Sequence, residues 1–132
     1  MIRTELREHI FKLLFQEEFN QEEDMQEHLK YYFMTLENAA DKDKDYIQEK
    51  YEAVAGHIAE IDELINQYAK GWKTTRMNKV DLAILRLAVY EMKWDEDVPT
   101  GVAINEAVNL AKKYSSEDGA SFVNGVLAKL AD

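Results

Sequence analysis

Apolar side chains recur at the spacing of one helix face through the middle of this chain, and this periodicity constrains the fold more than any other feature. The steps between them alternate between four and three residues, which places them on one side of an α-helix. The stripe consists of Ile47, Tyr51, Val54, Ile58, Ile61, Ile65 and Tyr68, with Leu64 alongside. No stretch alternates apolar and polar residues for long enough to form a sheet, so the sequence predicts an all-α protein.

Boundary residues divide the chain into further helices. The 132 residues include one proline and five glycines, a composition that suits helices joined by short turns. Helices are predicted over about 3–18 and 25–39, separated by a polar turn at 20–24. The long helix that follows 41–45 should run to about Lys70, where Gly71 ends it by adopting left-handed backbone. Gly56, inside this helix, is expected to mark a close packing contact.

The second half should contain three more helices. Asn78 is predicted to cap the first, Pro99 to open the second, and Ser115 or Ser116 to cap the last. The simplest packing is one domain over 1–132 made of two small helical bundles. The N-terminal helical subdomain would span about 1–71 and the C-terminal one about 78–132.

Composition excludes several classes of protein. The chain has no cysteine, which removes disulfides and thiolate chemistry. No signal peptide is expected, because charged residues such as Arg3 and Glu5 interrupt the N-terminus. Uncharged runs such as 119–128 are too short to cross a bilayer, so no membrane partner is expected. The sequence therefore predicts a soluble, cytoplasmic protein.

No constellation for catalysis is found. A di-metal carboxylate site in a helical bundle needs Glu three residues before His, and neither His9, His28 nor His57 has one. No phosphate-binding glycine loop or His-Glu-x-x-His motif is present. We expect no catalytic residues, no metal site, no cofactor and no enzymatic activity.

The net charge of −10 argues against general coating of nucleic acid, so any RNA contact must come from a local patch. Residues 1–65 hold 17 acidic and 7 basic side chains, whereas residues 66–132 hold 9 of each. A basic cluster near an aromatic ring can bind single-stranded RNA through phosphates and base stacking. The alternative is that these lysines stabilise helix ends and that the ring belongs to the core. The candidate RNA-binding residues are Arg3, Arg7, Lys12, Lys73, Lys112, Lys113, Asp118 and Phe122.

Arg86 lies in an apolar run between Leu85 and Leu87. An unpaired buried guanidinium would be costly, so a structural ion pair with Glu91 or Glu106 is expected.

Three segments in the second half of the sequence resemble those of a known protein family. They are Ala83-Ile-Leu-Arg-Leu-Ala-Val-Tyr-Glu91, then Val98-Pro99 with Val102-Ala-Ile-Asn-Glu-Ala-Val108 and Leu110-Ala-Lys-Lys-Tyr114, and Phe122-Val-Asn-Gly-Val-Leu127. In this order they resemble the NusB family, and Arg7-Glu8 with Leu14-Phe15 is similar to the family's first helix.

The resemblance implies a fold of two helical bundles and a role in transcription antitermination during ribosomal RNA synthesis. It implies binding of boxA-type single-stranded RNA together with NusE, a small-subunit ribosomal protein. The complex would join the RNA polymerase elongation complex through other Nus factors, and no chemistry is performed.

The resemblance also assigns residues. Arg3 and Arg7 match an arginine-rich RNA-binding motif, which Ile2, Thr4 and Glu5 thin out. Asp118 and Phe122 are similar to positions on the family's RNA surface. Phe15 and Asp81 are similar to positions on the surface that faces NusE, and are the candidate partner-binding residues.

Two alternatives stay open on the same fold. One is a protein-interaction module with weak or lost RNA binding, which the thinned arginine motif and the net charge favour. The other is the NusB-like RNA-binding domain of an RNA methyltransferase, which would require a catalytic domain beyond Asp132.

Overall fold

The fold is all-helical wherever the structure describes it. The structure is a computed structural model that describes residues 1–19 and 24–132, and these contain seven α-helices, one short 3-10 helix and no strand. The all-α prediction is therefore confirmed. Most of the predicted turn at 20–24 lies outside the described residues. The chain forms two compact units, Met1–Gly56 and His57–Asp132.

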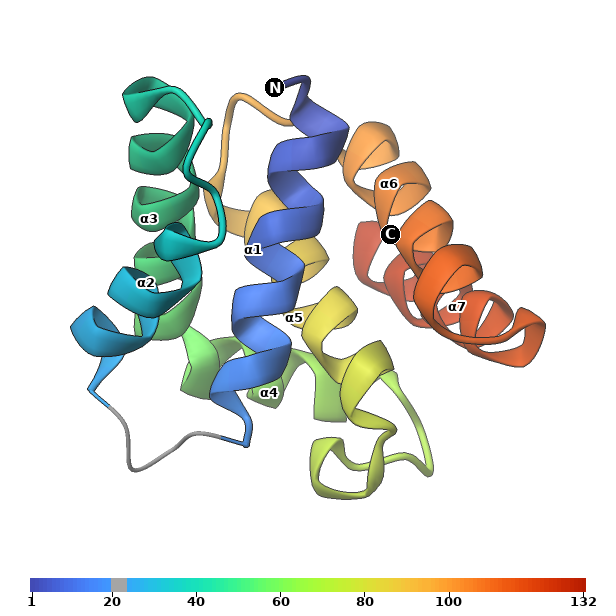
Figure 1. The fold of residues 1–132 in the computed structure, drawn as a ribbon. Helices are drawn as coiled ribbons and strands as arrows, with labels where there is room; N and C mark the ends of the chain where they lie inside the picture. Colours follow the sequence, from blue (N-terminus) through green and yellow to red (C-terminus); the bar gives the residue numbers. More distant parts are fainter. Residues whose placement is uncertain (20–23) are drawn as a thin grey trace. The chain divides into compact units, whose positions relative to one another are not determined.

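The first unit contains α1 (Arg3–Glu17), α2 (Met25–Met34) and α3 (Asp41–Gly56), with α1 packed against both others (Figure 1). Asp24 caps α2 by accepting a hydrogen bond from the Gln26 backbone N–H. The fully buried side chains at its centre come from α1 and α3, and those of α3 belong to the predicted apolar stripe. These are Ile10, Leu13, Ile47, Tyr51 and Val54.

The second unit contains α4 (Ile58–Tyr68), the 3-10 helix η1 (Thr74–Arg76), α5 (Lys79–Trp94), α6 (Thr100–Tyr114) and α7 (Glu117–Ala131). Helix α5 contacts α4, α6 and α7 and has more buried residues than any other helix of this unit. Every residue of α5 from Asp81 to Leu85 is buried. Alanines at 103, 107 and 111 are buried on α6, where small side chains allow close helix packing.

Several predicted boundaries are confirmed by the hydrogen bonds of the caps. The Asn78 side chain accepts from the backbone N–H groups of Val80 and Asp81 at the start of α5. Ser116 is the cap of α7 and accepts from Gly119 N. Gly71 has a φ of +84°, the left-handed conformation that was predicted for it.

Other boundaries differ from the prediction. The expected long helix is two helices, because α3 ends at Gly56 and α4 begins at Ile58. Gly56 thus ends a helix instead of packing inside one, and a Cβ at this position would meet no atom within 4 Å. Helix α2 also stops at Met34, before the expected end at 39. Pro99 is the N-cap of α6, just before its first turn.

The division into units falls one helix earlier than predicted. Helix α4 belongs with the second unit because it packs against α5 and α7. Arg86 connects α5 to α4 through a two-pronged ion pair with Asp62, at 2.9 Å from Nε and 2.8 Å from Nη2. The sequence predicted an ion pair at Arg86 but did not name Asp62 as a partner.

No helix among the described residues is long and apolar enough to cross a membrane.

Candidate nucleic-acid interface

Two aromatic rings meet on the second unit. Trp72 follows Gly71 in the turn before η1 and is 57% exposed. Its ring lies 5.9 Å from that of Phe122 on α7, with an angle of 66° between the planes. Phe122 is half-buried. The pair therefore presents aromatic surface to solvent, the kind of surface on which bases stack.

The rings border a pocket of about 390 Å³. It is lined by Trp72, Met77, Asn78, Asp81, Ser116, Asp118, Gly119 and Phe122. The structure thus brings together Asp118 and Phe122, predicted to bind RNA, with Asp81, predicted to bind the protein partner. The sequence analysis assigned no role to Trp72. The feature that could have indicated one is the position of this aromatic residue in a predicted short linker, where a side chain is not expected to be buried.

The carboxylate of Asp81 is the unusual polar group of this pocket. The residue is 8% exposed, and its Oδ1 is buried with no hydrogen-bond partner among the described residues. Gly119 makes room for it, because a Cβ on Gly119 would lie 3.0 Å from this oxygen and would collide with Ser115 Oγ. An unpaired buried acceptor is rare in folded proteins and needs an explanation.

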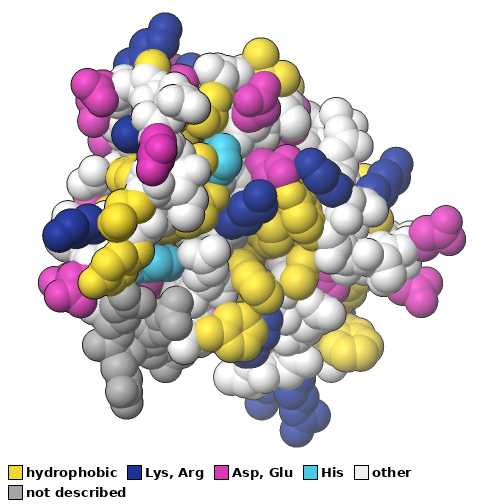
Figure 2. Space-filling view, viewed as in Figure 1, with side chains coloured by type: hydrophobic (Ala, Val, Ile, Leu, Met, Phe, Trp, Pro, Cys, Tyr) yellow, Lys and Arg dark blue, Asp and Glu magenta, His cyan; other side chains and the backbone are white. Residues whose placement is uncertain are grey.

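Cations flank the pocket along one segment of the chain. Lys73, Arg76 and Lys79 each stand next to a lining residue, and the first two are exposed. In Figure 2, dark blue side chains project beside the turn that carries η1. The surroundings therefore combine acidic groups inside the pocket with positive charge beside it.

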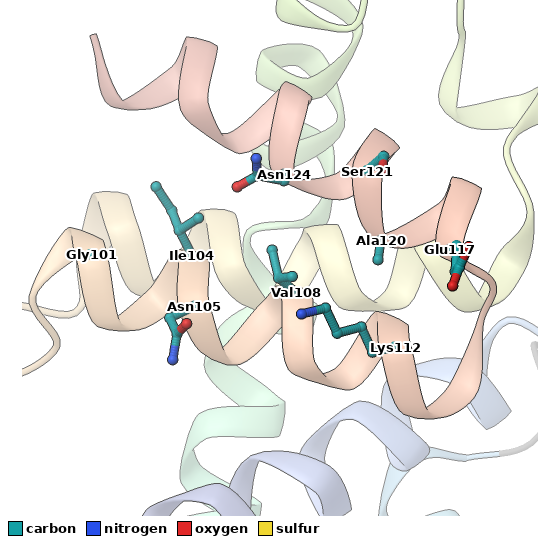
Figure 3. A pocket seen from close by; sticks show the side chains of 9 residues that line it. All are labelled: Gly101, Ile104, Asn105, Val108, Lys112, Glu117, Ala120, Ser121 and Asn124. Atoms are coloured by element: carbon teal, nitrogen blue, oxygen red, sulfur yellow. The ribbon is translucent and has the colours of Figure 1, made fainter.

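Lys112 and Lys113 end α6 and are both exposed, but they differ in their surroundings. The Lys113 amine lies 5.4 Å from the centre of the Tyr114 ring. Lys112 lines a different hollow, of about 650 Å³, between α6 and α7. In Figure 3, Ile104 and Val108 point from α6 toward α7, and Lys112 extends back toward Val108. The structure does not place Lys112 in the pocket that holds Phe122.

The predicted cations of the first unit have three different environments. Arg3 is exposed and donates a hydrogen bond from Nη1 to the Tyr46 hydroxyl at 2.7 Å, with its guanidinium 4.7 Å from the ring centre. Lys12 lies 3.8 Å from Glu8, one helical turn away. Arg7 is 4% exposed and interacts with other groups, so it is not on the surface where the sequence placed it.

Aromatic side chains also line the end of α1. Phe15 is half-buried and stands 5.0 Å from the ring of Phe19, which is 63% exposed. Helix α2 adds exposed Tyr31 and Met34, and Figure 2 shows hydrophobic side chains on the surface over this helix. Exposed apolar groups of this kind are typical of protein-interaction surfaces.

His9 is a titratable group whose pKa the surrounding structure shifts. Burial, followed by the nearby charge of Lys12, lowers the pKa of His9, whose Nδ1 shares a hydrogen bond of 2.7 Å with the Tyr32 hydroxyl. Among the described residues, no group of three or more His, Cys, Asp or Glu side chains is arranged to hold a metal ion.

Comparison with known proteins identifies the family of this chain. The model of the NusB family matches residues 4–132. The chain belongs to the NusB family.

Named relatives cover the whole chain. The transcription antitermination protein NusB of Agathobacter rectalis is 51% identical over 131 residues, which are 99% of this chain and all of that protein. The protein of the same name from Lachnoclostridium phytofermentans is 44% identical, over the full length of both chains. The family and these names describe antitermination factors, not enzymes.

Solved NusB structures share the fold. T. maritima NusB has a TM-score of 0.91 at 35% identity, covering 99% of this chain and 91% of its own. A crystal structure of the antitermination factors NusB and NusE in complex with dsRNA has a TM-score of 0.86 at 26% identity, covering 99% and 98%. The predicted resemblance to the NusB family is therefore confirmed.

Proposed function

We propose that this protein is a transcription antitermination factor that binds boxA-type single-stranded RNA together with NusE during ribosomal RNA synthesis. Acting in the cytoplasm, the resulting complex joins the RNA polymerase elongation complex through other Nus factors. The protein performs no chemistry, and its function is coupled binding of an RNA and a protein.

The observation that carries this proposal is the aromatic pair Trp72–Phe122 beside Lys73 on the second unit. Stacking holds a base, while a flanking cation neutralises a phosphate. Relatives named antitermination proteins, and a similar structure of NusB and NusE in complex with dsRNA, support the coarser proposal that the protein binds an RNA together with NusE.

Coupling to NusE suits the charge of the chain. With a net charge of −10, this protein alone should bind RNA weakly. A second protein on the same RNA raises the effective affinity, because one contact raises the local concentration of the other. Phe15, Phe19 and Asp81 are the candidate contacts for NusE.

The experiment is a titration of fluorescently labelled boxA RNA with the purified protein, with and without NusE. We expect NusE to tighten binding by at least tenfold.

Trp72→Ala and Phe122→Ala should each weaken RNA binding about tenfold, since stacking contributes about 1–3 kcal/mol per base. Val102→Ala, which shortens an exposed apolar side chain of α6 outside the pocket, is the control. Equal affinity with and without NusE would contradict the coupled mechanism.

One observation favours a second candidate function. Burial of Arg7 leaves Arg3 as the exposed arginine of the thinned motif, which suits a protein-interaction module with weak RNA binding. In that case, the titration would detect NusE binding but no salt-dependent RNA binding.

A further inference from the structure

A buried polar cluster connects the end of α1 to the two other helices of the first unit. His28 of α2 is buried, and its two ring nitrogens face oxygens of consecutive residues of α1. Nδ1 lies 3.0 Å from Glu17 Oε2, and Nε2 lies 2.9 Å from Gln16 Oε1. The Tyr51 hydroxyl of α3 donates to the same Glu17 oxygen at 2.6 Å. Side chains of three helices therefore meet at the last turn of α1.

The intrinsic stability of α1 does not explain this cluster. Glu17 is the last residue of the helix, where a negative charge opposes the helix dipole, and the last turn contains no basic residue. An imidazole with a proton on each nitrogen donates to two acceptors, whereas a neutral one donates to one. In its protonated form, His28 therefore offsets the charge at the end of α1 and holds both side chains that face it.

The residues that His28 holds are next to two aromatic rings. The Phe19 N–H donates to the Gln16 carbonyl at 3.0 Å, and the contact between the Phe15 and Phe19 rings places them on one side of the turn. Successive residues of an α-helix are about 100° apart, so positions 16 and 17 point about 100° and 200° away from Phe15. Holding these two positions against α2 and α3 thus sets the direction in which the rings point.

We propose that His28 is a positioning residue for partner binding, which orients the rings of Phe15 and Phe19 without touching the partner. This inference rests on the proposed function, in which both rings are candidate contacts for NusE. The His28 side chain is 6% exposed, so it offers a partner almost no surface of its own. Its effect on affinity must therefore pass through the last turn of α1.

The first test compares two histidines that connect the same two helices. His28→Leu keeps the bulk of the side chain and removes both donors. His9→Leu, the matched control, removes the 2.7 Å hydrogen bond between Nδ1 and the Tyr32 hydroxyl, which lies about two turns before the end of α1. We expect His28→Leu to weaken NusE binding about tenfold and His9→Leu to change it less than about twofold. Isothermal titration calorimetry measures the affinities.

A conservative variant keeps the inference testable where His28→Leu does not fold. His28→Gln keeps an amide N–H group near the position of Nε2, so we expect it to weaken NusE binding only about threefold. Circular dichroism and urea unfolding give the stability of each folded variant. If affinity falls in proportion to lost stability in the His28 and His9 variants alike, His28 only stabilises the fold and the inference is wrong.

A double-mutant cycle tests whether His28 acts through the rings. Phe19→Ala removes an exposed side chain and should weaken NusE binding about tenfold. In this background, His28→Leu should weaken binding by a further threefold at most, about a third of its effect alone, because coupled residues give non-additive losses. Fully additive losses would overturn the positioning role.

The outcomes separate this inference from the proposed function. Absence of NusE binding by the unmodified protein overturns the proposed function. If the unmodified protein binds NusE, and His28→Leu and His28→Gln bind it equally tightly, the positioning role alone is overturned.

Discussion

Two glycines of α7 experience opposite environments although they belong to one helix. Gly119 is buried, and a Cβ there would meet Ser115 and Asp81. Gly125 is exposed, and a Cβ there would meet nothing within 4 Å. The pocket therefore depends on the absence of a side chain at 119, whereas glycine at 125 only lowers helix propensity.

We predict that Gly119→Ala lowers the free energy of unfolding by about 1–3 kcal/mol, because an added methyl group in a packed site forces neighbours apart. Gly125→Ala, the matched control, should raise it by about 0.5–1 kcal/mol. Urea unfolding followed by circular dichroism measures both. Equal effects of the two variants would show that the pocket tolerates a methyl group at 119.

Capping residues could be predicted one by one from the sequence, whereas the members of the pocket could not. Asn78 and Ser116 act on backbone groups two or three residues away, so local sequence determines their role. Trp72, Asp81 and Phe122 come from three separate segments, and only tertiary packing brings them together. The burial of Arg7 was missed for the same reason, because helical spacing alone does not define which side of α1 is covered.

At the level of helices, the periodicity of apolar residues predicted that helices exist but not where they stop. The stripe from Ile47 to Tyr68 continues in phase through Gly56 and His57, so the pattern contains no sign of the break between α3 and α4. Glycine is the one local signal there, and its low helix propensity is tolerated inside many helices.

The ion pair between Asp62 and Arg86 is the best-defined polar link between α4 and α5. Both side chains are mostly buried, with exposures of 21% and 12%. We predict that Asp62→Ala lowers the free energy of unfolding by about 1–3 kcal/mol, because it removes two charge-assisted hydrogen bonds from the guanidinium. Glu63→Ala, which changes the exposed acid next along α4, should alter it by less than about 0.5 kcal/mol.

Chemical denaturation of the two variants, in parallel with the unmodified protein, provides the comparison. If Asp62→Ala lowers the free energy of unfolding no more than Glu63→Ala does, water replaces the carboxylate as the hydrogen-bond partner of Arg86 without loss of stability.

At the scale of the whole molecule, charge is distributed unequally between the units. Residues 1–56 hold 14 acidic and 7 basic side chains, whereas residues 57–132 hold 12 and 9. The more nearly balanced second unit is also the one with the aromatic pocket and its flanking cations. RNA affinity should therefore depend on a few cations near the pocket and not on the overall field of the protein.

We predict that, in the presence of NusE, the logarithm of the RNA-binding constant falls linearly with the logarithm of the salt concentration. Lys73→Gln should make the slope of this line shallower by about 0.7. This is the contribution of one neutralised phosphate on a single strand. Lys30→Gln, which changes an exposed lysine of α2 in the other unit, should leave the slope unchanged. Titrations of labelled boxA RNA at several KCl concentrations give the slopes. If Lys73→Gln lowers the affinity by the same factor at every salt concentration, Lys73 positions Trp72 and does not contact a phosphate.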